Sequence, residues 1–376
     1  MSQQGVFLKS ITIRQFRNIQ GLKLDFDAHI NYFYAPNGTG KTNVLEAIQC
    51  ISLGKTLRAG LETEVVPHAS TSDDLREGTQ VLGIFEDADK IDFSHSYKIF
   101  TYPKRTKLLE IHKNRVKIHD FLGKVPSIWF SPESMQIVTA SPRSKRTYFD
   151  EIMMQLFPGY LHDLRNYNRA LSQRNRLLQD YPVRPELIRV WTEQLIQYGA
   201  NLMSSRKKFF SMVNEQLQML DSISRYRFQV QVSPDVHIHE IFDEDAAYAF
   251  RKELREHYST DLAKRVTIRG PHKDTWNLLI RINEESGYID ASRYASRGQQ
   301  RMALIILQLV VVGLVERVLG RKPILLLDDI FSELDEENTS ILIDFIKRNN
   351  IQCIITGVDH MQLEGAAVLD LENVIR

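Results

Sequence analysis

Eight consecutive residues, Ala35-Pro36-Asn37-Gly38-Thr39-Gly40-Lys41-Thr42, have the composition of a loop that binds phosphate. The apolar run from Ile30 to Tyr34 predicts a buried strand before them, and the run from Asn43 to Ile48 predicts a helix after them. Backbone N–H groups at a helix N-terminus bind phosphate oxygens, and the helix dipole favours their negative charge. We expect Lys41 to reach the β- and γ-phosphates of ATP, and Thr42 to ligate Mg²⁺.

Ala35 departs from the usual pattern, in which such a loop begins with glycine. Alanine adds a methyl group at a crowded turn, where unusual backbone angles would favour glycine. We therefore predict a lower affinity for nucleotide but the same kind of site. The alternative is a glycine-rich turn whose lysine has no ligand.

A second candidate lies in the last third of the chain, where four apolar residues, 324–327, precede Asp328 and Asp329. This pattern is typical of a buried strand whose tip carries the metal-binding and water-activating groups of an ATPase. Asp328 is expected to bind Mg²⁺, directly or through water, and Asp329 to orient or deprotonate the attacking water. The alternative is a buried strand that ends in an acidic turn.

A third candidate is the segment Ser296-Arg297-Gly298-Gln299-Gln300-Arg301, which opens a long apolar stretch. A hydroxyl at a helix N-terminus can form a second anion site, and two such sites have a use if they face each other across a dimer. Serine is also a favoured N-cap, so plain helix capping is the alternative. Ser332 to Asp335 is likewise either a loop at a dimer contact or the cap of the next helix.

Composition limits the classes of protein to which the chain can belong. The 376 residues carry a net charge of +1, so binding to a polyanion would have to be local. The two cysteines match no metal-ligand spacing, and the N-terminus has no signal core, so a reduced, cytoplasmic location is expected. The apolar run from Met302 to Val315 is shorter than the ~20 residues of a membrane span and predicts a buried core helix.

Hydrophobic periodicity divides the chain into three parts. Residues 1–141 read as a β-rich lobe, residues 142–264 as a helical arm, and residues 265–376 as a return to alternating helices and strands. The arm contains a long amphipathic helix from Pro185 to Ser224, and the last part contains an apolar strand from Pro323 to Leu327. The predicted fold is α/β, with one sheet shared by both chain ends. Further strands are expected at 8–14, 22–26, 81–85, 91–100, 108–112, 115–118, 227–232, 266–269, 277–282 and 352–355, and further helices at 244–258, 299–319 and 341–347.

Basic residues gather between Lys98 and Lys124, with Phe100, Tyr102 and Phe121 among them. This pattern indicates either a solvated strand face or a patch that follows a phosphate backbone. The candidate DNA contacts are Lys104, Arg105, Lys107, Lys113, Arg115, and Arg206, Lys207 and Lys208 on the presumed polar face of the long helix.

Together these motifs resemble the RecF family of recombination-mediator ATPases of the ABC/SMC type, over most of the chain. The matching segments are 13–18 (Ile-Arg-Gln-Phe-Arg-Asn), 37–48, 130–133 (Phe-Ser-Pro-Glu), 173–175 (Gln-Arg-Asn), 270–274 (Gly-Pro-His-Lys-Asp), 296–301 and 327–335. The resemblance implies an ABC-type ATPase head made from both chain ends, with an inserted helical arm and no long coiled coil. It also adds Arg17, Asn18 and Asn43 to the nucleotide-binding residues.

The same resemblance implies a mechanism. ATP is held between the loop of Lys41 in one subunit and Ser296, Gly298 and Gln299 of the other. Closure of the dimer clamps DNA, hydrolysis is slow, and the family acts with RecO and RecR to place the RecA recombinase on single-stranded gaps. These roles belong to DNA repair, recombination, replication and the SOS response.

Five positions qualify the resemblance. Lys273 stands where the family usually has arginine, and Thr275 where a second acidic residue is usual. Lysine cannot form a bidentate fork, so a contact from 273 would be weaker. The basic pair after Pro142 is Lys145-Arg146. His360, four residues after Thr356, is expected to be a surface histidine and not a γ-phosphate sensor.

Four other classes are weighed against this one. A small-molecule kinase or GTPase would not need the Ser296 segment, and the Asn-Lys-x-Asp guanine motif is absent. A transporter ATPase would carry Thr42 and Asp328 within one compact domain, whereas most of this chain lies between them. A Rad50/SMC head would need hundreds of heptad-patterned residues. A DNA clamp with a silent site stays open, because Asp329 is shorter than glutamate.

Overall fold

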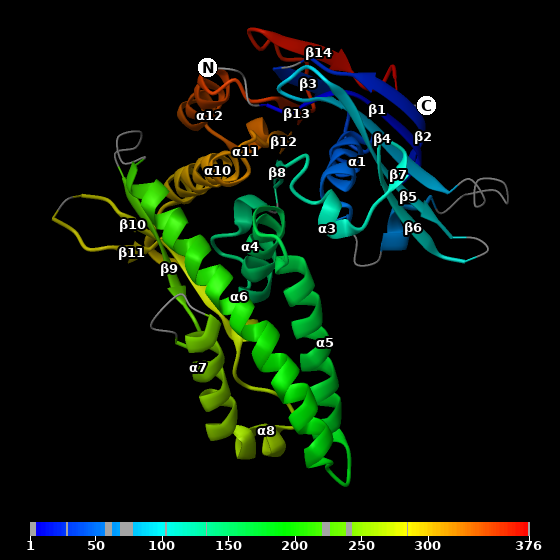
Figure 1. Ribbon diagram of the computed structural model, residues 1–376. Helices are drawn as coiled ribbons and strands as arrows, with labels where there is room; N and C mark the ends of the chain where they lie inside the picture. Colours follow the sequence, from blue (N-terminus) through cyan, green and yellow to red (C-terminus); the bar gives the residue numbers. More distant parts are fainter. Residues whose placement is uncertain are drawn as a thin grey trace. The chain divides into compact units, whose positions relative to one another are not determined.

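The structure is a computed structural model that describes residues 5–27, 29–56, 62–67, 78–101, 104–132, 134–219, 226–237, 243–283 and 285–374 (Figure 1). Three residues used in the predictions lie outside these ranges: Tyr102, Glu133 and Ser224. The chain forms two compact units. The end unit comprises Met1–Gln136 and Val311–Arg376, and the insert unit comprises Ile137–Val310. The contacts therefore place residues 265–310 with the helical segment, whereas the sequence suggested a boundary at 264/265.

A parallel five-stranded sheet in the end unit joins the two ends of the chain. Its order is β14 (Ala366–Asp370), β3 (Ile30–Tyr34), β13 (Cys353–Gly357), β12 (Ile324–Asp328) and β8 (Ser127–Phe130). Every residue of β12 and β13 is buried, which explains their continuous apolar sequences. The prediction of one sheet shared by both ends is confirmed.

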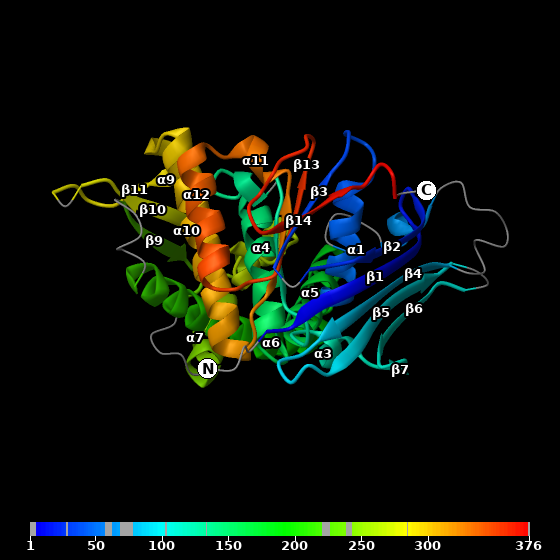
Figure 2. The same cartoon turned by 90° about the horizontal axis from the view of Figure 1, so that it is seen from above.

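An antiparallel sheet forms the other layer of the end unit. Its order is β2 (Ile19–Asp25), β1 (Phe7–Phe16), β4 (Thr79–Glu86), β5 (Asp92–Phe100), β6 (Thr106–Ile111) and β7 (Asn114–Arg115). Helix α1 (Lys41–Leu53) lies between the two sheets and is buried along most of its length (Figure 2). The end unit also contains η1 (Glu62–Val65), α3 (Ile118–Phe121), η2 (Ser134–Gln136), α11 (Ile330–Glu333) and α12 (Glu336–Arg348). The strand predicted at 115–118 is wrong beyond Arg115, because α3 begins at Ile118.

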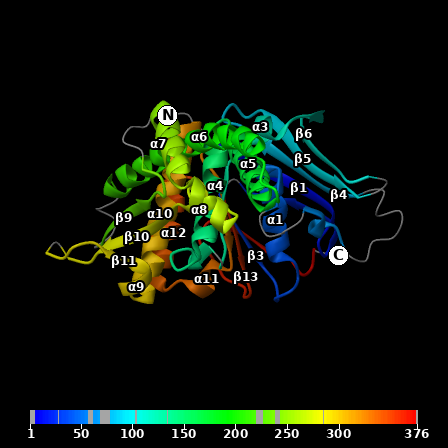
Figure 3. The same cartoon turned by 90° about the horizontal axis from the view of Figure 1, so that it is seen from below.

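The insert unit is mostly helical. Helices α5 (Tyr160–Gln179) and α6 (Pro185–Met219) pack side by side (Figure 3). A small antiparallel sheet has the order β11 (Ile289–Asp290), β10 (Thr275–Arg281) and β9 (Arg227–Ser233). The other elements are α4 (Pro142–Leu156), α7 (Asp243–Glu256), α8 (Tyr258–Lys264), η3 (Pro271–Lys273) and α9 (Ala291–Tyr294).

The strand predicted at 266–269 is wrong, because these residues form an irregular segment. Side chains satisfy its polar groups in place of a neighbouring strand. The Thr267 N–H donates to Asn175 Oδ1 at 2.8 Å, and the Ile268 N–H donates to Asp261 Oδ1 at 3.0 Å. Asp261 is in turn paired with the buried Arg174 at 2.8 Å. The segment is thus fixed by long-range contacts that a local pattern does not reveal.

Helix α10 (Arg297–Leu319) begins in the insert unit and ends in the end unit. Within the described ranges it is the single helix that is long and apolar enough to cross a membrane, by length and composition only. Of its most apolar window, 72% is buried inside the protein, as expected for a core helix.

Candidate nucleotide-binding site

The loop after β3 has the backbone that its glycines predict. Gly38 and Gly40 have φ values of 86° and 114°, in the region that favours glycine. A side chain at position 40 would also place its Cβ 3.0 Å from Asn18 Oδ1. Gly40 directly precedes the first residue of α1, so the loop ends at a helix N-terminus, as predicted.

Ala35 does not have the strained backbone expected for it. It is buried, its φ is not positive, and its N–H donates to Gly357 O at 3.3 Å across the parallel sheet. Alanine is therefore compatible with the backbone of the turn, so the unusual angles expected there do not occur, and a lower affinity for nucleotide stays a prediction.

Lys41 folds back onto the loop that precedes it. Its ammonium group donates to Ala35 O at 2.5 Å and to Pro36 O at 3.0 Å, and the residue is 7% exposed. Burial lowers the pKa of Lys41, and the nearby Asp329 and Asp328 oppose that shift. A cation is thus held in the loop by neutral carbonyl groups, close to two carboxylates.

Thr42 and Asp328 meet although 286 positions separate them. The Thr42 hydroxyl donates to Asp328 Oδ1 at 3.0 Å. Asp328 is the last residue of β12, so the strand that ends beside α1 brings this carboxylate to the loop. The sequence predicted both as metal ligands, and the structure places their oxygens within hydrogen-bond distance of each other.

Thr356, for which no role was predicted, also contacts Asp328. Its hydroxyl donates to Asp328 Oδ1 at 2.8 Å. The following residue, Asp329, has a left-handed backbone with φ 49°, and its N–H donates to Thr356 O at 3.1 Å. A hydroxyl at the end of a strand next to an acidic strand end is the signal that could have drawn attention to Thr356.

Arg17 forms hydrogen bonds with two residues of the end unit. Its guanidinium binds both carboxylate oxygens of Glu46, at 3.0 and 2.8 Å, and donates to Glu64 O at 3.0 Å. The Glu46 side chain is fully buried on α1. Nucleotide contact by Arg17 stays a prediction. No role was predicted for Glu46, its partner in the ion pair.

Asn18 forms hydrogen bonds with the backbone of the loop. Its amide donates to Gly38 O and Thr39 O, each at 3.3 Å, and accepts from Asn43 Nδ2 at 2.7 Å. Asn18 therefore contacts the backbone of the loop itself, and its contact with nucleotide stays a prediction.

Ser296 caps helix α10 and is exposed to solvent. Its hydroxyl accepts from the Gln299 N–H at 3.3 Å, and its N–H donates to Gln299 Oε1 at 2.9 Å. Gln300 fixes the preceding turn by donating to Ala291 O at 2.9 Å and Ala295 O at 3.2 Å. The capping interpretation is confirmed. The anion-site interpretation of Ser296, Gly298 and Gln299 stays a prediction, and the exposed hydroxyl is available for it.

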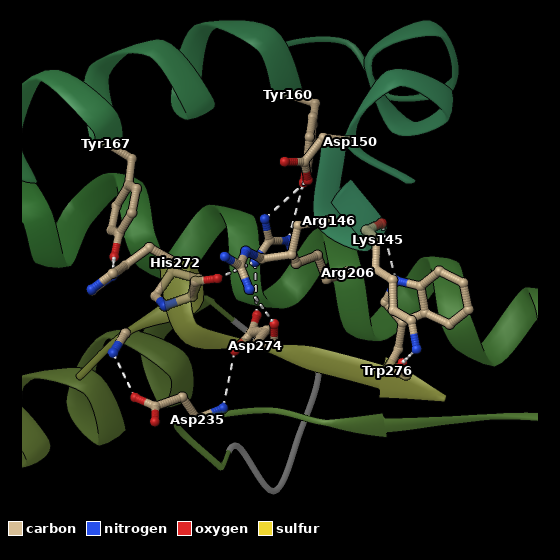
Figure 4. Close-up of polar contacts among 12 residues, drawn as sticks. Lys145, Arg146, Asp150, Tyr160, Tyr167, Arg206, Asp235, His272, Asp274 and Trp276 are labelled. Atoms are coloured by element: carbon tan, nitrogen blue, oxygen red, sulfur yellow. Dashed lines mark hydrogen bonds and ion pairs between the residues drawn. The ribbon is translucent and has the colours of Figure 1, made fainter. Parts of the chain in front are cut away.

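Arg206 is buried, so its prediction as a DNA contact is wrong. It donates to Asp274 Oδ2 at 2.8 Å, to Asp150 Oδ1 at 2.9 Å and to Pro271 O at 2.6 Å (Figure 4). Tyr160, whose hydroxyl donates to Asp150 at 2.6 Å, completes this cluster, and Arg206 Nε donates to the same hydroxyl at 3.2 Å. Arg206 therefore holds α6 to α4 and to the turn at 270–274.

Two of the other positions singled out in the insert unit, Lys145 and Arg146, also have internal partners. Lys145 is buried, lies over the ring of Trp276 and donates to Trp276 O at 3.2 Å (Figure 4). Arg146 donates to Asp274 O at 2.8 Å. Lys273 is exposed, and Thr275 begins β10.

The remaining basic candidates lie mostly on the surface. Lys104, Arg105, Lys113, Arg115 and Lys208 are exposed, so DNA contact stays a prediction for them. On β5, in contrast, Lys98 pairs with Glu110 at 2.8 Å, which fits a solvated strand face.

His360 is exposed, and its ring meets the ring of Tyr34 edge-on at 5.1 Å between centroids. Its prediction as a surface histidine is confirmed.

The side chains at the loop suit one hard cation shared with a phosphate. Magnesium is usually bound through one or two carboxylates together with phosphate oxygens and water. Thr42 and Asp328 supply a hydroxyl and a carboxylate at one point. No group of three or more His, Cys, Asp or Glu side chains that could hold a metal occurs among the described residues.

Known proteins match this chain over nearly its whole length. Residues 7–373 match the family model of the RecF/RecN/SMC N terminal domain. The DNA replication and repair protein RecF of Lachnospira eligens is 32% identical, over 93% of this chain and 92% of its own length. The protein of the same name from Clostridioides difficile is 30% identical, over 97% and 96%.

Solved structures agree with these relatives. A structure described as the recombination mediator protein RecF-ATPrS in the RecFOR pathway has a TM-score of 0.87 at 27% identity, covering 99% of this chain and 98% of its own. The corresponding RecF-ATP structure has a TM-score of 0.85 at 27% identity, over 98% and 97%. An SMC head bound to a domain of ScpA, at 13% identity and a TM-score of 0.51 over 94% and 90%, shares the fold alone. The chain therefore belongs to the RecF family and has the fold of an ABC/SMC-type ATPase head.

Proposed function

We propose that this chain is a recombination-mediator ATPase that binds ATP with Mg²⁺, dimerises on it and clamps DNA near single-strand gaps. The clamp helps to load the recombinase during recombinational repair and replication restart, and slow ATP hydrolysis opens it again. The observation that carries the proposal is the meeting of Thr42 and Asp328 beside the loop of Lys41. Its setting in a chain that matches ATP-bound RecF over nearly its full length supports ATP as the ligand.

The loop residues have separate roles in this proposal. The backbone N–H groups of residues 38–42 hold the phosphates, and Lys41 exchanges its carbonyl partners for phosphate oxygens. That exchange is favourable, because a buried cation gains more from an anion than from neutral oxygens. Thr42 and Asp328 hold Mg²⁺, which supplies charge neutralisation to the phosphates when it is bound.

Asp329 is the group proposed to orient or deprotonate the attacking water. It is partly exposed, follows the metal-binding Asp328, and lies close enough to Lys41 to act on its pKa. Ser296 of a second copy is proposed to complete the site, because its hydroxyl is exposed at the N-terminus of a helix of 23 residues. Hydrolysis is then slow in a single subunit, since part of the transition-state stabilisation comes from the other.

The partners follow from the family. We propose that the chain binds duplex DNA and gapped junctions, acts with RecR and RecO in the cytoplasm, and takes part in the SOS response. The exposed basic residues of the end unit, including Lys104, Lys113 and Arg115, are the proposed phosphate contacts.

ATP-dependent dimerisation is the test of this proposal. Wild type is expected to change from monomer to dimer in light scattering when ATP and Mg²⁺ are added. Lys41→Ala is expected to stay monomeric, because the loop loses the charge that binds the phosphates. Lys23→Ala, on the exposed face of β2, is the matched control and should dimerise like wild type. Dimerisation of Lys41→Ala with ATP would contradict the proposal.

An SMC-like head without a role in recombinase loading is the second candidate. The shared fold alone supports it. Against it, the insert unit folds into a compact body with its own three-stranded sheet, and its longest described helix, α6, has 35 residues. Stimulation of the ATPase by gapped DNA together with RecR, measured against lipid vesicles, separates the mediator from both this candidate and a transporter subunit.

A further inference from the structure

Thr356 contacts both acidic residues at the tip of β12. The residue is fully buried near the end of β13, and the parallel register pairs it with Asp328. Its hydroxyl donates to Asp328 Oδ1 at 2.8 Å and accepts from the Asp329 N–H at 3.2 Å. Its backbone oxygen accepts from the same N–H at 3.1 Å. One side chain therefore links the carboxylate at the strand end to the backbone of the residue that follows.

We propose that Thr356 is a positioning residue of the nucleotide site, which orients the Asp328 carboxylate and fixes the start of the turn at Asp329. The inference rests on the proposed function, because it assigns the two carboxylates the roles given there. It concerns residues of the end unit alone.

Two hydroxyl groups hold the Asp328 carboxylate. Its Oδ1 atom accepts two hydroxyl hydrogens, one from Thr42 and one from Thr356. Thr42 is itself expected to bind the cation, so its hydroxyl cannot be the fixed support of the carboxylate. Thr356 has no such second task and remains as the support. Residues that hydrogen-bond a ligating carboxylate from behind orient it and tune the metal site.

Thr356 also holds the backbone of Asp329. Asp329 has φ 49°, a left-handed conformation that residues other than glycine seldom adopt, although asparagine and aspartate do so more often than the rest. Both oxygens of Thr356 accept from its N–H, so the conformation is held by the neighbouring strand. Loss of the Thr356 hydroxyl removes one of the two acceptors that hold the Asp329 N–H at this turn.

A purely structural role is the competing explanation, since a buried hydroxyl has to be hydrogen-bonded anywhere. The two roles differ in what depends on magnesium. A structural role affects the protein with and without the metal, whereas a positioning role affects the binding of ATP only when Mg²⁺ is present.

The experiment compares Thr356→Val, which replaces the hydroxyl by a methyl group of similar size, with Thr356→Ser, which keeps the hydroxyl. Binding of a fluorescent ATP analogue is titrated at fixed nucleotide with increasing Mg²⁺, and separately in EDTA. Ser52→Ala is the matched control, because Ser52 is another buried hydroxyl of the end unit and donates to Val125 O. Thr356→Ala is the second hydroxyl-free variant if the valine packs poorly.

For Thr356→Val we expect about a tenfold or greater rise in the Mg²⁺ concentration needed for tight binding, and unchanged binding in EDTA. Thr356→Ser should restore the wild-type requirement, and Ser52→Ala should not change it. The proposal is overturned if both hydroxyl-free variants keep the wild-type Mg²⁺ requirement, or if their loss is equal in EDTA.

Asp328→Asn in the same titration distinguishes a failure of the proposed metal site from a failure of the proposed role of Thr356. If Asp328→Asn keeps the wild-type Mg²⁺ requirement, the proposed function loses its metal site. If Asp328→Asn loses Mg²⁺-dependent binding while Thr356→Val does not, only the role of Thr356 fails.

Discussion

Replacing Arg206 with methionine should destabilise the insert unit more than any surface substitution of the same kind. The guanidinium binds Asp274 at 2.8 Å and Asp150 at 2.9 Å, and all three side chains are largely buried. Burial raises the pKa of Asp274, and Arg206 opposes that shift, so the carboxylate relies on the guanidinium for its charge. Removal of one partner of a buried ion pair typically costs about 3–5 kcal/mol.

That cost is a large part of the total stability, because a domain is stable by only ~5–15 kcal/mol. Methionine keeps much of the packing volume of arginine. The decrease in the free energy of unfolding therefore reports mainly on the two carboxylates left without a cation, and less on a cavity. The triple variant with Asp150→Asn and Asp274→Asn should recover more than half of the loss, since no uncompensated charge stays buried. Lys208→Met, two positions along α6 and exposed, is the control and should change stability by at most about 0.5 kcal/mol.

Urea unfolding followed by the fluorescence of Trp276 is the assay. This indole packs on Phe149 at 4.4 Å between ring centroids and reports on the insert unit. Trp129 and Trp191 are replaced by phenylalanine in the parent, so that a single tryptophan gives the signal. If Arg206→Met loses less than about 1 kcal/mol, or no more than the control, the assignment of Arg206 as the buried ionic link of this unit is refuted.

Three further predictions concern acid stability, turnover and DNA. Burial lowers the pKa of His95 and of His272 to about 4. The contribution of these neutral histidines to the free energy of unfolding is therefore fully present above their unfolded pKa near 6.5 and is lost as the pH falls towards 4. Each histidine should account for about 3 kcal/mol of that loss, and His272→Gln should flatten the pH dependence of urea unfolding. Asp329→Asn should leave ATP binding intact and reduce single-turnover hydrolysis by about 10²-fold or more, whereas unchanged turnover would favour a silent clamp. Neutralising Lys113 or Arg115 should lower the salt slope of DNA binding by about one for each true phosphate contact, with Lys264→Ala of the insert unit as control.

Local patterns predicted the elements around the nucleotide loop because each one is encoded by neighbouring residues. The apolar run 30–34 and the glycines at 38 and 40 specify a strand and a turn without reference to the rest of the chain. The run 324–327 likewise predicted β12, and parallel pairing brought Asp328 to the loop. The meeting of Thr42 and Asp328 was accessible from sequence because both residues lie at the ends of strongly patterned elements, and their binding of Mg²⁺ stays a prediction.

The misses at Arg206 and at residues 266–269 have a common physical cause, which is tertiary pairing. Arg206 was placed on a polar face, yet it is spaced four residues after Leu202 and three before Phe209, which puts it on the buried stripe of α6. A charge on such a stripe signals a buried partner, and Asp150 and Asp274 come from distant elements. The irregular segment at 266–269 was mistaken for a strand for the same reason.

The central claim is that one nucleotide site takes Lys41 from one subunit and Ser296 from another, and a subunit-mixing experiment tests it most directly. Lys41→Ala and Ser296→Arg are purified separately, and each alone should lack ATPase activity. If the site is shared, each mixed dimer contains one intact site, made from Lys41 of the Ser296→Arg subunit and Ser296 of the Lys41→Ala subunit, and the equal mixture should regain at most about half of the wild-type activity. If the mixture stays as inactive as its components while both variants remain folded and dimerise with wild type, Lys41 and Ser296 do not act across two subunits.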